Sequence, residues 1–314
     1  MKMPAGRSWA YAALGLGVLV VSSSSILVRY AQAAGVPSLS IAALRLALAA
    51  LLLTPLALAR TAGEIRGLPR RDMVLALLAG SLLAAHFATW ISSLAYTSVA
   101  SSTVLVTTNP IWIALASMLI FRERIARRLV VAIGIAVGGS ALIFLADSGA
   151  GGGGAGGETA QPNPLLGNTL ALLGALSVSG YFLIGRALRR RLSLLAYIWL
   201  IYASCACVLV GVALIAEAPL WGFSATGWGF LFALALGPQL LGHSVFNWAL
   251  KHVSTTFIAL AILGEPIGSS LLALLLFGER LSLLQSAGFA VLLCGIYLAA
   301  RSEDLGASAG TARD

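Results

Sequence analysis

Glu265 stands out among the residues of this sequence that could do chemistry. It is the only one of 11 acidic residues that falls in the middle of an apolar segment. An ionised carboxyl inside a membrane helix costs roughly 3 kcal/mol or more, so such residues usually hold a substrate, an ion or a proton. We expect Glu265 to pair with a substrate ammonium group or to carry a proton. A protonated carboxyl bonded to a neighbouring helix is the alternative.

Prolines interrupt two apolar segments at matching places. Asn109 precedes Pro110 in one segment, and Gly264 and Glu265 precede Pro266 in the other. Proline removes a backbone donor and disturbs the carbonyl one turn earlier, so both segments should kink or open there. Paired interruptions of this kind point to a solute-binding site near the membrane midplane. A kink that serves only packing is the alternative.

Two histidines occupy equivalent places in separate apolar segments. His86 is followed by Trp90, and His243 is followed by Asn247 and Trp248. Residues three or four positions apart share one helical face. Each group therefore offers ring walls and a polar head, the mixture that small-molecule pockets use. A satisfied hydrogen bond between helices is the alternative for either histidine.

Two further polar side chains have more than one interpretation. Arg45 lies only a few residues into its apolar segment, so its long side chain either reaches the lipid headgroups or contacts a ligand. Tyr181 is a candidate for the lining of the cavity, with simple packing as the alternative.

The elements that must position these residues are membrane helices. Of 314 residues, 59% are hydrophobic and only 10% are charged, which leaves too little polar surface to cover a soluble globule. A spanning helix needs about 20 mostly apolar residues, and ten such segments fit the sequence. We expect them near residues 9–29, 39–59, 73–95, 102–121, 129–146, 164–186, 195–216, 226–249, 253–276 and 283–300.

The net charge of +9 could suggest nucleic acid, but the basic residues fall in short clusters between the apolar segments. That distribution argues against a nucleic-acid-binding face and follows the positive-inside rule instead. With the N-terminus in the cytoplasm, all of the 20 basic residues except Arg29, Arg45 and Arg280 fall on the cytoplasmic side. We therefore expect a multi-pass protein of the bacterial inner (plasma) membrane with both termini in the cytoplasm.

The two halves of the sequence match each other at nearly one offset. A shift of 157 positions aligns Gly17, Ser22, Arg29, Gly80 and His86 with Gly174, Ser179, Arg186, Gly237 and His243. A shift of 156 positions aligns Pro110, Ile111, Phe121, Glu123 and Arg124 with Pro266, Ile267, Phe277, Glu279 and Arg280. Matched Pro, His, Glu and Gly positions are hard to obtain by chance in so apolar a chain, so we infer an internal duplication.

Each half holds an odd number of helices, so the second half enters the membrane from the opposite side. We expect an all-α integral membrane protein of ten transmembrane helices, built as two inverted five-helix repeats, a design that supports alternating access. The expected units are a first repeat over 9–146, a Gly-rich external linker over 147–163, a second repeat over 164–300 and a cytoplasmic tail over 301–314.

The segment from Gly242 to Glu279 carries a pattern similar to that of a known family. It begins Gly-His-Ser-Val-Phe-Asn-Trp-Ala-Leu-Lys-His-Val-Ser and continues with Gly-Glu-Pro and Phe-Gly-Glu-Arg. The chain resembles the EamA family of the drug/metabolite transporter superfamily over nearly its whole length, as two EamA-like repeats. Arg45 matches the arginine common in the second helix of the first repeat. Arg122, where the family often has Gly, and Asn109, at the place of Glu265, make the two halves chemically unequal.

The resemblance implies a ten-helix exporter of metabolites such as amino acids, or of drugs, with a central cavity formed by helices 1, 3, 4, 6, 8 and 9. We accordingly expect a secondary transporter that moves a small organic molecule across the lipid bilayer by alternating access. Proton coupling, if present, would use Glu265, His86 or His243.

No enzymatic activity, cofactor or metal is expected. The helices hold no His-Glu-x-x-His, no paired acidic motif and no Ser-His-acid set, and the three cysteines have no ligands at metal spacing around them. The alternatives are an intramembrane lipid-modifying enzyme and a non-transporting membrane scaffold or channel.

Overall fold

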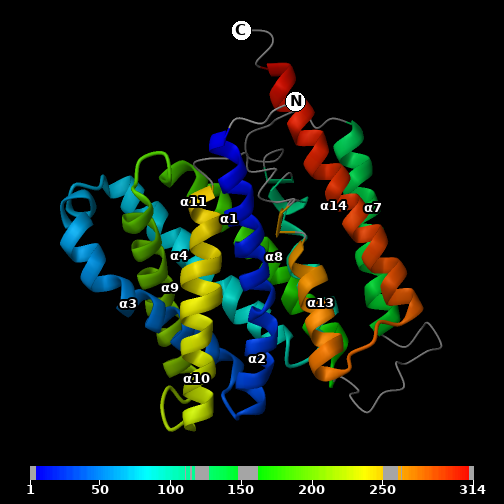
Figure 1. The fold of residues 1–314 in the computed structure, drawn as a ribbon, viewed down its shortest axis with the longest axis horizontal. Helices are drawn as coiled ribbons and strands as arrows, with labels where there is room; N and C mark the ends of the chain where they lie inside the picture. Colours follow the sequence, from blue (N-terminus) through cyan, green and yellow to red (C-terminus); the bar gives the residue numbers. More distant parts are fainter. Residues whose placement is uncertain are drawn as a thin grey trace.

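The computed structural model describes residues 5–109, 111–113, 115–116, 127–147, 162–249, 261–262 and 264–310. Every regular element within these ranges is a helix (Figure 1). The expected all-α class is therefore confirmed.

The described helices carry the labels of Figure 1. They are α1 (Ala5–Ser22), α2 (Ser24–Ala33), α3 (Ser38–Arg66), α4 (Arg70–Ser93), α5 (Val99–Val106), α7 (Arg127–Asp147), α8 (Pro164–Leu188), α9 (Leu194–Ile215), α10 (Ala225–Leu234), η1 (Ala235–His243), α11 (Ser244–Ala249), α13 (Gly264–Phe277) and α14 (Leu283–Gly310). The start of α1 and the end of α14 lie at the same end of the bundle (Figure 1).

Six stretches of the described helices are long and apolar enough to cross a membrane. They are Ala13–Ala33, Ser38–Arg66, Arg70–Ser93, Pro164–Leu188, Leu194–Ile215 and Ala225–Ala249. Shorter apolar helices cover Val130–Ile143, Gly264–Phe277 and Leu283–Gly295. Large apolar side chains such as Leu51, Leu165 and Leu275 point outward from the bundle, as lipid-facing positions require. The chain is a multi-pass membrane protein.

Two of the expected helices are interrupted, and each interruption has a local cause. The first breaks at Ser23, where the Ser22 hydroxyl donates to the Val18 carbonyl at 2.8 Å and the Ser23 hydroxyl to the Val20 carbonyl at 2.7 Å. Serine hydroxyls that bond to the preceding turn bend a helix. The eighth becomes a π-helix over η1, which contains Pro238, a residue without an N–H to donate. The first break packs beside η1, and Gly242 lies against Val21.

Glycine allows α7 and α14 to pack closely at one side of the bundle (Figure 1). A Cβ on Gly139 would lie 2.7 Å from the Cα of Leu292, and one on Gly295 would lie 2.8 Å from the Cα of Ala136. Membrane helices lack a hydrophobic drive toward one another, so close backbone approach supplies much of their attraction. Gly138, beside Gly139, faces open space instead.

This difference predicts opposite outcomes for two neighbouring substitutions. Gly139→Ala forces α7 away from α14 because the new methyl would overlap the Leu292 backbone, and we expect a loss of about 1–3 kcal/mol of stability. Gly138→Ala adds its methyl to open space, so its effect should stay within about 0.5 kcal/mol. Thermal unfolding of both purified variants in detergent checks this, and equal melting temperatures would contradict the packing argument.

Candidate solute-binding site

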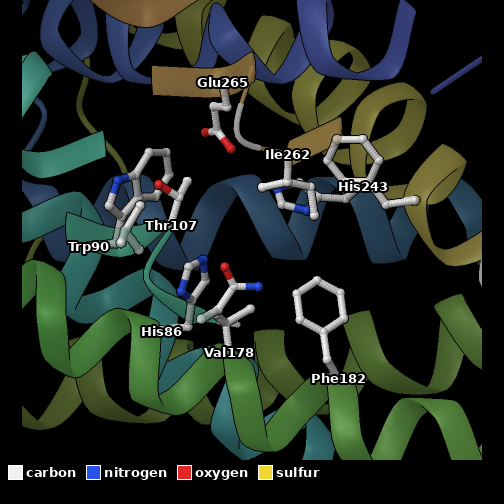
Figure 2. Close-up of a pocket in the computed structure, with 11 residues that line it drawn as sticks. His86, Trp90, Thr107, Val178, Phe182, His243, Ile262 and Glu265 are labelled. Atoms are coloured by element: carbon white, nitrogen blue, oxygen red, sulfur yellow. The ribbon is translucent and has the colours of Figure 1, made fainter. Parts of the chain in front are cut away.

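Side chains from α4, α5, α8, the η1–α11 span and the region of α13 meet around one cavity (Figure 2). They are His86, Trp90, Val106, Thr107, Asn109, Val178, Phe182, His243, Phe246, Ile262 and Glu265. The cavity volume is about 40 Å³. Since a water molecule needs at least about 10–15 Å³ of such volume, the cavity has room for only a few waters. An organic solute requires the lining helices to move apart.

His86 and Trp90 form one wall of the cavity. The Nδ1 atom of His86 lies 3.0 Å from the carbonyl oxygen of Gly174 on α8. A carbonyl only accepts, so Nδ1 carries the proton, and Nε2 of a neutral ring is an acceptor without a donor among the described residues. The ring stacks on Trp90 at 6.0 Å with an interplanar angle of 8°. The Trp90 indole N–H is buried and has no acceptor among the described residues.

Glu265 projects from the first turn of α13 toward the cavity (Figure 2). The residue is only 8% exposed, and no described side chain or N–H group donates a hydrogen bond to its carboxyl. The backbone is held instead, because the Ser22 hydroxyl approaches the Glu265 carbonyl at 3.4 Å and the Ser269 hydroxyl donates to the Ser22 carbonyl at 3.1 Å. A buried carboxylate without donors favours a bound cation or a proton.

The segment after α5 supplies Thr107 and Asn109. The side chain of Ser98 accepts from the Ser101 N–H at 3.0 Å and caps the start of α5, and the helix ends at Val106. A turn follows at residues 107–108, and the Asn109 carbonyl accepts a hydrogen bond from the Ser179 hydroxyl at 3.1 Å. The helix is thus broken at residues 107–108, and the chain is helical again at Asn109, directly before Pro110, which itself lies outside the described residues.

The second predicted interruption, at Pro266, falls in α13. Gly264 and Pro266 belong to α13, and residues 261–262 shortly before it are helical as well. Residues 250–260 and 263 lie outside the described part of the chain. An opening of the helix at Pro266 therefore stays a prediction.

His243 lies on the opposite side of the cavity from Trp90 (Figure 2). Its ring contacts Phe87 edge-on at 5.6 Å and Phe246 at 6.1 Å. The surroundings of this histidine are thus aromatic, which suits the apolar part of a solute.

Three residues of the predicted site lie outside the cavity lining. The Tyr181 hydroxyl donates to the Asn247 side-chain oxygen at 2.7 Å, which joins α8 to α11. Trp248 packs against the apolar cluster that contains Leu14 and Phe246. A direct role for these three residues in binding stays a prediction, to which the structure adds a role in packing.

Arg45 does not reach the lipid headgroups, so the snorkelling interpretation is wrong. The side chain is fully buried, with its guanidinium 4.5 Å from the centre of the Phe87 ring. Its Nε donates to the Gln239 side-chain oxygen at 3.0 Å, and Nη1 donates to the Ser24 hydroxyl at 2.9 Å. Arg45 lies on the face of α3 that meets the two interrupted helices. Its side chain is therefore buried, although the residue is only a few positions from the start of α3.

The sequence comparison identifies the family to which this arrangement belongs. The sequence model of the EamA-like transporter family matches residues 8–145 and again 165–301. The chain belongs to the EamA-like transporter family. The resemblance noted from the sequence is thereby confirmed, and the protein is a membrane transporter of the drug/metabolite type.

Solved structures support the same fold. A structure described as "Crystal structure of protein" is 20% identical to this EamA-like transporter, covers 93% of this chain and 96% of its own, and superposes with a TM-score of 0.61. At this level of identity the likeness concerns the fold alone. No curated protein sequence matches the chain.

We predict that Arg45 is essential to the shape of the site. Arg45→Ala leaves Gln239 and Ser24 without their partner at both helix interruptions, so we expect a loss of about 2–4 kcal/mol. Arg60→Ala, an exposed position on the same helix, should change stability by less than about 0.5 kcal/mol. Thermal unfolding in detergent compares the two. A wild-type melting temperature for Arg45→Ala would show that the guanidinium contributes nothing to the packing.

Proposed function

We propose that this transporter is a secondary carrier that exports small organic molecules with a cationic group, such as amino acids or drug-like amines, by alternating access. The observation that supports the proposal best is the Glu265 carboxyl, which faces the cavity without a hydrogen-bond donor among the described residues. A substrate ammonium group is the partner that such a carboxylate lacks.

The rest of the cavity suits the remainder of such a molecule. Trp90, Phe182 and Phe246 give apolar and aromatic surface, while Asn109 and the free Trp90 N–H provide polar contacts. A few polar groups within a mostly apolar lining is the usual composition of a small-molecule site. The lining suits an amphipathic solute.

Proton exchange at the same carboxyl would drive the export. Protonated Glu265 cannot hold an ammonium group by charge, so substrate and proton bind in turn. A proton that enters from outside displaces the substrate there, and its loss on the cytoplasmic side readies the carboxylate for the next molecule. The free Nε2 of His86 and the ring of His243 line the same cavity and are candidates to pass this proton.

The two family matches and the basic-residue distribution support the alternating-access part of the proposal. We infer ten spans in two inverted repeats, 9–146 and 164–300, joined by an external linker over 147–163. Both termini and the tail over 301–314 lie in the cytoplasm of a bacterial cell. EamA-like proteins are transporters rather than enzymes, so we do not propose the lipid-modifying alternative.

Single cysteines at the two ends of α8 test this topology. In a variant without native cysteines, Pro162→Cys should react with a membrane-impermeant maleimide in intact cells, whereas Arg190→Cys should react only after the membrane is opened. Both positions are exposed, so access depends on the side of the membrane. The reverse pattern would place the termini outside and overturn the orientation.

Glu265→Gln tests the chemistry. We expect transport of radiolabelled amino acids or of ethidium to fall about 100-fold, the equivalent of about 3 kcal/mol lost with a charge-assisted contact, and to lose its dependence on a proton gradient. Proteoliposomes with an imposed pH gradient measure both effects. Glu217→Gln removes an exposed carboxyl and should leave transport unchanged. Full activity of Glu265→Gln across pH would remove Glu265 from the mechanism.

A further inference from the structure

An ion pair joins the two halves of the chain at the end of the bundle opposite the start of α1. Arg29 on α2 belongs to the first half, and Glu279 lies in the connection between α13 and α14 in the second half. The Nη2 atom of Arg29 lies 3.1 Å from Oε1 of Glu279. Both side chains are mostly covered, with 21% and 11% of their surface exposed. A pair this well shielded interacts more strongly than one in open water.

The same two side chains also hold the connection between α4 and α5. Arg29 donates to the Thr97 carbonyl at 2.8 Å, and the other Glu279 oxygen accepts from the Val99 N–H at 3.0 Å. Val99 is the first residue of α5, so Glu279 bonds an N–H that the helix leaves unpaired. The Thr97 hydroxyl in turn donates to the Asn168 side chain of α8 at 2.9 Å.

Aromatic contacts reinforce the junction beside the ion pair. Tyr30 follows Arg29 and stacks on Phe230 of α10 at 5.5 Å, with an interplanar angle of 13°. It also contacts Phe277, the last residue of α13, at 5.2 Å. Helices α5, α8 and α13 carry cavity residues farther along their length, so a fixed junction here keeps the cavity-lining helices together at this end.

The internal repeat gives Arg29 an equivalent at the other end of the bundle. Arg186, which a shift of 157 positions aligns with Arg29, lies near the end of α8. Its side chain is exposed and forms no ion pair with any residue that the structure describes. Two equivalent arginines therefore have unequal surroundings in the present conformation. In an inverted repeat, each half adopts the shape of the other when access switches.

We propose that the Arg29–Glu279 pair is a latch that closes this end of the carrier and separates when the cavity opens there. The proposal rests on alternating access. In the opposite conformation Arg29 takes the exposed surroundings that Arg186 has now, and α13 moves away from α2 and α5. Burial raises the pKa of Glu279, while the Arg29 guanidinium and the Val99 N–H oppose that rise, so the bonded carboxylate depends on its partners.

Thiol labelling measures whether the latch controls access. Thr107→Cys places one thiol in the cavity of a chain freed of its native cysteines, and Ser282→Cys identifies the vesicle face on which the α13–α14 connection lies. We expect Arg29→Gln and Glu279→Gln each to raise the labelling rate of the thiol at position 107 from that face about tenfold. The double variant should gain no more than either single one, because both changes remove the same pair.

Matched variants separate a latch from a merely structural contact. Arg280→Gln removes an exposed charge next to Glu279 and should leave the labelling rate unchanged. Arg29→Lys keeps the charge but has fewer donors, so it should give an intermediate labelling rate. It replaces Arg29→Gln in the comparison if Arg29→Gln folds poorly. Only protein that elutes as a single species is compared. Unchanged labelling in both folded single variants, or additive effects in the double variant, would overturn the proposal.

This experiment also distinguishes the latch from the proposed transport function. If the carrier does not alternate, the thiol of Thr107→Cys, with Arg29 and Glu279 intact, reacts equally from both membrane faces or from neither. The ratio of the two labelling rates then stays the same in the latch variants. If alternation holds but the latch does not, the ratio differs between faces and stays the same in Arg29→Gln. Each failure therefore has its own labelling pattern.

Discussion

A bilayer offers no water to a buried guanidinium, and the need to satisfy Arg45 inside the bundle is the constraint on which the site depends. Nε and Nη1 of Arg45 bond to Gln239 and Ser24, and the guanidinium lies over the ring of Phe87, while Nη2 has no partner among the described residues. Two of these partners belong to interrupted helices, since Ser24 begins α2 directly after the break that separates it from α1 and Gln239 lies within η1. Arg45 thus ties the interrupted parts of the first and eighth spans to α3, and His243 is the last residue of η1.

Two polar groups that face the cavity stand without protein partners in the described part of the chain. The Trp90 N–H and the Glu265 carboxyl lack partners among the described residues, whereas nearby polar groups such as Tyr181 and Asn247 bond to each other. Unsatisfied polar groups are costly in an apolar interior. Other buried side-chain atoms without a partner in that part of the chain, such as Nη2 of Arg45 and the Ser40 hydroxyl, lie away from the cavity lining. A missing partner therefore marks a group as available to a solute only where that group also faces the cavity.

Much of this arrangement could be predicted from sequence, because rare residues in apolar segments carry a clear signal. His86, Trp90, Asn109, His243 and Glu265 all line the cavity, and each is a polar or aromatic side chain at a position that its spacing marks as a candidate. Thr107 and the apolar lining residues were missed, because a threonine or valine in a membrane helix looks the same at a cavity as in packing.

The direction in which a side chain points is harder to predict from sequence. Arg45 faces the interior although it lies near a helix end, and Tyr181 and Asn247 bond to each other while their role in binding stays a prediction. Sequence spacing gives the relative angle between residues on one helix, yet the face that meets a neighbour depends on tertiary packing. The break at Ser23 and the π-helix of η1 were missed for a related reason, since both depend on how adjacent helices satisfy freed backbone groups.

The small cavity has a consequence for the energy supply of the cell. A volume of about 40 Å³ admits a few water molecules, whose chain would extend less than about 10 Å, while the hydrocarbon layer is about 30 Å thick. Such a short file of water cannot by itself carry protons from one aqueous phase to the other. Among the described residues the cavity therefore gives protons no continuous water path, which is what a carrier that depends on an ion gradient requires.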